Sequence, residues 1–217
     1  MKKELYGKRT HPAPDRTRID IILRLTGTGK RVLDIGCYDG VVGREILVHQ
    51  NEVYGIDISE NAIRSAQAKD LDVCIADVDA GLPFRRQSFD EVIAGEVIEH
   101  VSDPDGLIEE IRRVLTSRGY LIVSTPNLAS LGRRLLLFLG RNPLVETRST
   151  EETAGHVRYF VKDTLFDLLA SHDFIVETFA SDVVNFTLSG RFRSARLAKI
   201  FPTIGRTLIV KAKVKDG

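Results

Sequence analysis

Aspartates close three successive apolar runs of this sequence, and a glycine-rich turn follows the first run. Asp34, Gly36 and Gly40 lie at the end of RVLDI, just before a helical pattern, where glycines let the backbone approach a ligand closely. Asp57 ends the second run 21 residues after Gly36, the distance at which an acid reaches ribose hydroxyls in open α/β folds. Asp77 ends the third run, where a carboxylate can accept a hydrogen bond from an exocyclic amine such as that of adenine. Each aspartate alone could be a cap or turn former, but the set indicates a ligand crevice.

The turn after the first run argues against a pyrophosphate ligand. A dinucleotide-binding G-x-G-x-x-G string that used Gly40 and Gly43 would need glycine at position 38, where this chain has Tyr38. The carboxylate of Asp34 suits an amino group and repels phosphate. A ligand with a cationic amino-acid end therefore fits this turn better than a phosphate does.

The string EVIEH follows the apolar run 89–95 and carries two carboxylates and an imidazole. If a helix begins just after that run, Glu96, Glu99 and His100 share one helical face at the same crevice. They could then hold a divalent ion such as Mg²⁺ or Mn²⁺, with His156 as a fourth ligand. Two alternatives stay open: a metal-free site in which His100 or His156 is a general base or orienter, and a purely structural role.

These side chains need a scaffold, and the sequence predicts one. Short β-branched apolar runs alternate with helical patterns, which is typical of a parallel sheet covered by helices on both faces. The fold class is therefore α/β, a Rossmann-like doubly wound sheet. Its expected strands lie at 31–35, 53–58, 72–77, 89–95 and 120–126, followed by an amphipathic helix over 161–174 and two closing strands at 174–182 and 207–214.

Several boundaries have local causes. Ser59 can cap a helix that follows it, and Asp103 with Pro104 opens an amphipathic helix that we expect to stop at Gly119. No helix-length apolar periodicity separates the two closing strands, so the sequence predicts a long basic hairpin-like connection between them.

The motifs D-x-G-x-x-x-G, Asp57, the AD pair at Asp77 and F-D-x-V-x-x-x-x-V-x-E-H resemble class I S-adenosylmethionine-dependent methyltransferases over about residues 30–130. That family has a seven-stranded, mostly parallel sheet with an antiparallel strand in its C-terminal hairpin. The resemblance implies S-adenosylmethionine as cofactor, with a helix such as 16–25 closing its site. The residues that it assigns to cofactor binding are Asp34, Gly36, Cys37 and Gly40 near the methionine end, Asp57 and Ile58 at the ribose, Asp77 and Val78 at the adenine, and Glu96 near the sulfonium.

Two methyltransferase groups share the Glu-x-x-Glu-His string, the ubiquinone-biosynthesis O-methyltransferases and the small-RNA 2′-O-methyltransferases, in which it holds a divalent ion together with a later histidine. The resemblance implies methyl transfer to an oxygen or nitrogen of a small acceptor, phenolic or lipid-linked. GHVRYF around His156 matches the D-H-x-F-E-W context of the RNA group poorly, so a metal-assisted RNA 2′-O-methyltransferase ranks lower. A non-catalytic cofactor-binding adaptor is a further alternative, supported by Tyr38 in place of the family's middle glycine.

The connection 127–160 is too long for a plain loop, so we expect it to carry a helix and to cover the acceptor as a lid. Its segment 133–141 places LLLFL among arginines, which suits a lid, an ordinary core helix or a surface that contacts lipid. Residues 183–217 carry eight basic side chains against one acid, while the rest of the chain carries 23 against 29. This basic section could be a solvated face or could bind an anionic acceptor or lipid headgroup; few aromatics make nucleic acid an unlikely partner.

At 217 residues and a net charge of +1 the chain is expected to be one domain, 1–217, with a cofactor-binding core over 30–126, the 127–160 lid and a closing hairpin over 174–214. Neither a signal peptide nor a run of 18 apolar residues is present. Cys37 and Cys74 are too few for a disulfide framework, which indicates the reducing cytoplasm. Nothing in the sequence indicates an oligomeric state.

Overall fold

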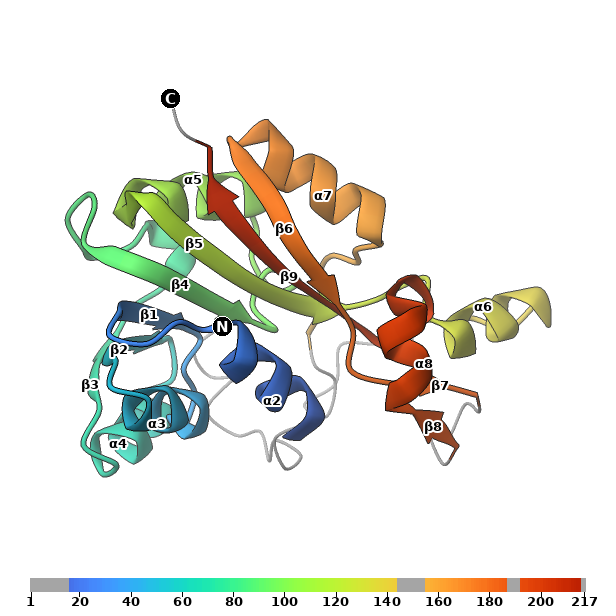
Figure 1. Ribbon diagram of the computed structural model, residues 1–217, viewed down its shortest axis with the longest axis horizontal. Coiled ribbons are helices and arrows are strands. Elements are labelled where there is room, and N and C mark those ends of the chain that lie inside the picture. The colour runs from blue at the N-terminus through green and yellow to red at the C-terminus, as the bar shows by residue number, and fades with distance from the viewer. Residues whose placement is uncertain (1–15, 144–154, 187–191, 216–217) are drawn as a thin grey trace.

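The computed structural model describes residues 16–143, 155–186 and 192–215. Their main element is one seven-stranded sheet (Figure 1). The helices are α2 (Arg16–Leu25), α3 (Val41–Val48), α4 (Glu60–Gln67), η1 (Val78–Ala80), α5 (Pro104–Val114), α6 (Leu131–Phe138), α7 (Lys162–Ser171), α8 (Ala195–Ile200) and η2 (Pro202–Ile204). The strands are β1 (Arg31–Ile35), β2 (Glu52–Asp57), β3 (Asp72–Ile75), β4 (Phe89–Gly95), β5 (Leu115–Pro126), β6 (Phe174–Ala180), β7 (Val184–Asn185), β8 (Arg193–Ser194) and β9 (Thr207–Val214).

The strand order of the large sheet is β3-β2-β1-β4-β5-β9-β6. Strands β1 to β5 run parallel, and β9 pairs antiparallel with both β5 and β6. The predicted α/β fold, with one antiparallel strand in its C-terminal hairpin, is therefore confirmed. The chain changes direction across the sheet between β1 and β4, and open α/β sheets bind their ligands at the carboxyl edge beside such a switch point.

Helices cover both faces of this sheet, as the alternation of runs predicted. Residues of α5 and α7, including Ile108, Ile111 and Leu165, pack on one face in the larger apolar cluster. Residues of α2 and α3, including Ile22 and Ile46, pack with α4 in a second cluster on the other face. Figure 1 shows α5 and α7 on one side of the sheet and α2, α3 and α4 on the other.

Local capping signals were reliable for two helix starts. The Ser59 hydroxyl accepts the backbone N–H of Ala62 at 3.3 Å, and the Asp103 carboxylate accepts that of Gly106 at 3.1 Å. The predicted helix stop at Gly119 was wrong, because α5 ends at Val114 and β5 begins at the next residue. The backbone carbonyl of Val114 accepts the N–H of Ser88, so pairing with the start of β4 captures the chain before the helix can continue.

The connections that follow β5 and β6 also differ from a plain loop. A helix inside the long 127–160 connection is confirmed, since α6 lies there, although residues 144–154 of that connection lie outside the described ranges. The prediction that β6 and β9 are joined without a helix was wrong. The connection contains α8, which Ser194 caps by accepting the N–H of Leu197 at 3.2 Å, and the two-stranded β7–β8 sheet. Six residues are too few for apolar periodicity to reveal a helix.

None of the helices in the described part of the chain is long and apolar enough to span a bilayer. Both cysteines in those ranges are free thiols, Cys37 buried and Cys74 exposed.

Candidate functional site

The glycine-rich turn after β1 crosses the end of β2. The backbone N–H groups of Gly36 and Cys37 both donate to the carbonyl of Ile56, at 2.8 and 3.0 Å. Gly36 has φ +69°, and a Cβ there would lie 2.5 Å from Cγ2 of Val97. Position 36 therefore needs glycine both for its left-handed backbone and for the close approach of the segment after β4.

Tyr38 and Asp57 fix the rest of the turn. Tyr38 has φ +47°, a left-handed conformation that costs a non-glycine residue free energy and that a glycine would adopt freely. Its backbone N–H donates to Oδ2 of Asp57 at 3.0 Å, while Oδ1 of Asp57 accepts the N–H of Ser59 at 2.8 Å. The carboxylate of Asp57 thus holds the ends of β1 and β2 together at the carboxyl edge. Tyr38 thus adopts the left-handed backbone that glycine would adopt at this position.

Asp34 lies buried beneath this turn. Burial, and then the nearby charge of Asp57, raise the pKa of Asp34 from its usual 3.8 to about 7, and Arg18 opposes that rise. Within the described ranges no hydrogen-bond donor reaches its Oδ2 atom. A buried carboxyl group without a donor favours a cationic or hydrogen-bond-donating ligand.

The remaining residues predicted to bind cofactor lie along the same edge. Cys37 is buried, and burial raises the pKa of its thiol. Ile58 directly follows β2 and is partly buried. Asp77 lies two residues beyond β3, where it caps η1 by accepting the N–H of Asp79 at 3.1 Å, and Val78 packs partly buried against the larger apolar cluster. Asp77 is therefore a helix cap, which the sequence had left open as an alternative role. Its role in cofactor binding stays a prediction.

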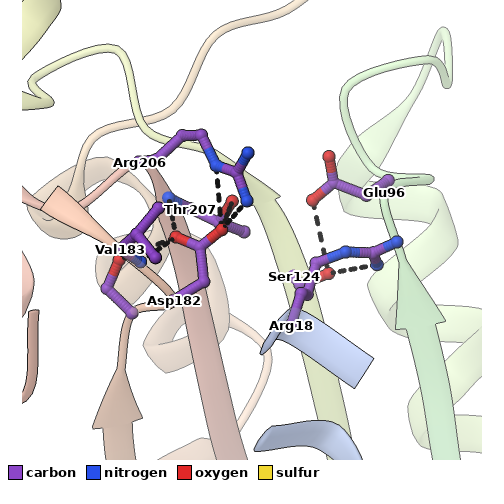
Figure 2. A network of polar contacts seen from close by, with 8 residues as sticks. Arg18, Glu96, Ser124, Asp182, Val183, Arg206 and Thr207 are labelled. Atoms are coloured by element: carbon purple, nitrogen blue, oxygen red, sulfur yellow. Dashed lines mark hydrogen bonds and ion pairs between the residues drawn. The ribbon is translucent and has the colours of Figure 1, made fainter. Parts of the chain in front are cut away.

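Glu96 follows β4 with φ +58°, which aims its side chain toward the end of β5. Its Oε1 accepts the Ser124 hydroxyl at 3.4 Å, and the guanidinium of Arg18 reaches the same hydroxyl from α2 at 3.3 Å (Figure 2). Burial raises the pKa of Glu96, and the charge of Arg18 opposes the rise. Helix α2 thus contributes a cation beside Glu96, at the predicted crevice along the carboxyl ends of β4 and β5.

The expectation that EVIEH starts a helix was wrong. The left-handed backbone of Glu96 is incompatible with a right-handed helix, and residues 98–100 form a turn in which the N–H of His100 donates to the carbonyl of Val97 at 2.9 Å. Helix α5 begins only at Pro104. The side chains of Glu96 and Glu99 therefore share no helical face.

The tertiary structure nevertheless gathers three of the four predicted metal ligands. Ligand atoms of Glu99, His100 and His156 all lie within 4.8 Å of one another. The rings of His100 and His156 are 4.7 Å apart between centroids, and Nε2 of His156 lies 3.8 Å from Oε1 of Glu99. Glu96 is not a member of this group.

Backbone contacts bring the histidine-bearing segment to Glu99. The N–H groups of Val157 and Arg158 donate to the backbone carbonyl of Glu99, at 2.9 and 3.2 Å. Nδ1 of His100 lies 3.3 Å from the carbonyl oxygen of Gly155. The end of the 127–160 connection is therefore fastened to the turn after β4. This contact brings His156 next to Glu99 and His100, as the predicted metal site requires.

The Glu99 carboxyl group is almost completely buried. The Thr125 hydroxyl donates to its Oε2 at 3.0 Å, whereas Oε1 has no hydrogen-bond partner in the part of the chain that the structure describes. Burial, reinforced by the charge of Glu96, raises its pKa well above the usual value. Oε1 is thus an available acceptor directed toward an imidazole.

Sequence reasoning missed a second polar network across the crevice. Asp182 is buried just after β6. Its carboxylate accepts hydrogen bonds from the backbone N–H groups of Val183 at 2.7 Å and Thr207 at 3.2 Å, and from the Nε–H of Arg206 at 2.9 Å. Figure 2 shows this network on one side and Glu96 on the other. The charge of Asp182 also contributes to the raised pKa of Glu96. Ser124 and Thr125 end a strand run and could have been found from that pattern; Arg18 and Asp182 carry no spacing signal.

The strand order β3-β2-β1-β4-β5-β9-β6, a glycine-rich turn after β1 and acids at the ends of β1 and β2 are the arrangement of the class I methyltransferase fold. Structural comparison supports this. A possible histamine N-methyltransferase from Thermotoga maritima superposes with a TM-score of 0.68 at 20% identity, over 92% of this chain and 88% of that one. A methyltransferase from Methanosarcina mazei superposes with a TM-score of 0.68 at 22% identity, over 90% and 97%. Both proteins are described as S-adenosylmethionine-dependent methyltransferases.

The sequence profile of the methyltransferase domain family matches residues 27–175, so the chain belongs to that family. Similar sequences include proteins named ubiquinone biosynthesis O-methyltransferase, from Chromobacterium violaceum, 30% identical over 120 residues, and from Paraburkholderia phymatum, 34% identical over 106. These matches cover 51% and 46% of this chain and 50% and 46% of the relatives. The chain thus spans about half the length of these relatives. The resemblance to class I methyltransferases is confirmed.

Proposed function

We propose that this protein transfers the methyl group of S-adenosylmethionine to an oxygen or nitrogen of a small-molecule acceptor, phenolic or lipid-linked. The observation that carries the proposal is the glycine turn 36–40 held by the Asp57 carboxylate over buried Asp34, in a chain of the methyltransferase domain family. The O-methyltransferase names of the relatives support oxygen as the methyl acceptor.

The residues present fit this cofactor. The unpartnered buried Oδ2 of Asp34 suits the ammonium of a methionine end, with Gly36, Cys37 and Gly40 beside it. Asp57 and Ile58 would meet the ribose, because the Asp57 oxygens keep lone pairs beyond the two N–H groups that they accept. Asp77 and Val78 would meet the adenine. Glu96 would face the sulfonium, whose positive charge suits a buried carboxylate.

Methyl transfer from a sulfonium is an in-line displacement, so much of its acceleration comes from alignment of the acceptor. The crevice between Glu96 and the Asp182 network is where we place that acceptor. His100 or His156 would act as the general base that takes a proton from an acceptor hydroxyl. The nearby Glu99 carboxyl group would stabilise the imidazolium that forms.

The same cluster also fits a divalent ion, and as the alternative to a general base we propose Mg²⁺ or Mn²⁺ held by Glu99, His100 and His156. The available Oε1 of Glu99 and the two nearby imidazoles make a suitable donor set. When bound, such an ion would supply Lewis-acid chemistry that lowers the pKa of an acceptor hydroxyl. Glu96 was also a predicted ligand but is not a member of this cluster. It would remain with the cofactor because its carboxylate faces Ser124.

Neither alternative function gains a specific observation. The RNA 2′-O-methyltransferase hypothesis depends on the metal cluster alone, and the adaptor hypothesis loses its argument because Tyr38 keeps the glycine-like backbone. An anionic acceptor, a single-domain organisation with a lid over the acceptor, and a cytoplasmic location remain predictions.

Calorimetric titration with S-adenosylhomocysteine tests the cofactor assignment. Wild-type protein should bind, and Asp57→Ala should lose binding because it removes both the ribose acceptor and the anchor of the turn. Asp72→Ala, at the exposed start of β3, is the matched control and should bind as wild type does. Absence of binding by wild type, or unchanged binding by Asp57→Ala, would refute the assignment.

Mn²⁺ titration followed by electron paramagnetic resonance tests the cluster. Glu99→Ala and His156→Ala should each abolish binding, while His49→Ala, on the exposed end of α3, should not. If both cluster variants retain Mn²⁺, the metal assignment is wrong, and a pH–rate profile that changes in His156→Ala would then favour the general-base alternative.

A further inference from the structure

Helix α6 exposes its apolar side chains. Five of its eight residues are leucine or phenylalanine, yet none of the eight is buried. Leu137 is 66% exposed, Phe138 87% and the following Leu139 65%. A surface helix of a folded domain normally buries such residues against the core, so this helix has an apolar face that the described chain leaves open.

A second set of exposed apolar residues lies beside α6. Ile200 at the end of α8 is 66% exposed and Phe201 53%. Both α6 and α8 pack against β7, so the two helices are neighbours in space although about 60 residues separate them in the chain. Figure 1 shows α6 projecting from the body of the molecule next to α8 and the β7–β8 pair. We call these exposed side chains, with the cations among them, the α6–α8 surface.

Among the described residues that form this surface and its strands, the charges have one sign. Residues 127–143, 183–186 and 192–215 contain no aspartate or glutamate. The exposed cations on or next to the two helices are Arg134 and Arg141 around α6, and Arg193, Arg196 and Lys199 on and before α8. This combination of apolar tips and cations complements an interface that is anionic at its surface and apolar just beneath.

We infer that the α6–α8 surface docks the protein on a bilayer containing anionic phospholipid. A projecting helix with open leucines and a phenylalanine can insert into the acyl boundary, while the arginines and lysine lie at the headgroups. An acidic protein would be recognised by the cations alone and would leave the projecting apolar residues without a function. The bilayer accounts for both features.

The surface is tied to the edge of the sheet that carries the site. The side-chain amide of Asn127, at the end of β5, donates to the carbonyls of Thr203 and Gly205 at 2.9 and 2.8 Å. It thereby joins the start of the 127–143 segment to the end of the α8 region. A docked molecule would hold its crevice next to the lipid, where a lipid-linked acceptor could enter; this last link rests on the proposed function, whereas docking itself does not.

Vesicle sedimentation without cofactor or acceptor tests the docking. The purified protein should sediment with phosphatidylcholine vesicles that contain phosphatidylglycerol, bind vesicles of phosphatidylcholine alone much more weakly, and be released by raised salt. Arg196→Gln with Lys199→Gln should weaken binding about 25-fold, at about fivefold per cation. Leu137→Ser with Phe138→Ser should weaken it by more than about tenfold.

Matched controls lie away from the surface. Val48→Ser removes an exposed apolar side chain at the end of α3, and Arg85→Gln with Arg86→Gln removes two exposed cations before β4. Both controls should bind vesicles as wild type does, and all variants should keep the wild-type circular dichroism because every substituted side chain is exposed.

Three results would overturn the inference: no sedimentation of wild type with anionic vesicles, equal losses in surface variants and controls, or an unchanged affinity in both surface variants. A wild-type dimer in gel filtration that Leu137→Ser with Phe138→Ser converts to monomer would also overturn it, because the surface would then be covered by a second copy. Because S-adenosylhomocysteine binding is measured separately, failure of docking and failure of the proposed function are distinguishable.

Discussion

Asp34 offers a quantitative test of how the glycine turn works. Its pKa is about 7 in the folded protein against 3.8 ordinarily, because the carboxyl group is buried and faces Asp57. Each pKa unit is worth about 1.36 kcal/mol, so ionised Asp34 destabilises the cofactor-free protein by about 4 kcal/mol relative to its protonated form. The group is fully buried, so solvent screening does not reduce this value much.

The sign of the pH dependence follows from proton binding. Below about pH 3.8 the folded and unfolded chains both hold the Asp34 proton, and the group does not affect stability. Between about pH 3.8 and about pH 7 only the folded state holds the Asp34 proton, so the free energy of unfolding falls as pH rises. Above about pH 7 the full penalty is present. Asp34→Asn, which stays neutral, should match wild type near about pH 4 and exceed it by up to about 4 kcal/mol near about pH 8.

Urea unfolding followed by circular dichroism, without cofactor and over this pH range, measures the difference. Asp72→Asn at an exposed position controls for the loss of a negative charge. S-adenosylhomocysteine should bind wild type more tightly as pH rises through about 7, because an ionised Asp34 attracts its ammonium, and Asp34→Asn should lose this dependence. Parallel stability curves for wild type and Asp34→Asn would refute the reasoning.

Three further substitutions test contacts that hold the fold together. Gly36→Ala should lower the melting temperature and S-adenosylhomocysteine affinity, because its Cβ would lie 2.5 Å from Val97 Cγ2; adding Val97→Ala should restore part of both, and no restoration would argue against the contact. Glu91→Gln should cost about 3 kcal/mol in urea unfolding, because it leaves the Lys211 ammonium, 3.1 Å away, partly buried without its counter-ion; a loss under about 1 kcal/mol would contradict this. Asp182→Ala should lower the free energy of unfolding by about 3 to 5 kcal/mol in the same assay, because the Val183 and Thr207 amides and the Arg206 guanidinium all lose the carboxylate that accepts their hydrogen bonds. A wild-type unfolding curve would show that this network does not stabilise the fold.

Local sequence determined most of the architecture. Apolar runs with period-specific spacing gave the parallel strands and their covering helices, since burial on both faces demands that pattern. Ser59 and Asp103 marked helix starts because a cap depends only on residues three positions away. The turn 36–40 with Asp57 was likewise predictable, because adjacent parallel strands bring their carboxyl ends to one edge.

The tertiary structure decided what surrounds that edge. Pairing with β4 ended α5 early, and the left-handed backbone of Glu96 prevented the expected helix at EVIEH, neither of which local propensity contains. Glu99 and His156 meet only because the backbone of a distant segment bonds to the carbonyl of Glu99. Arg18 and Asp182 reach the crevice from opposite ends of the chain. Sequence alone therefore determined the carboxyl edge of β1 and β2, whose residues lie on neighbouring strands. The fold decided the surroundings of Glu96 and Glu99, whose contacts join segments that no local spacing relates.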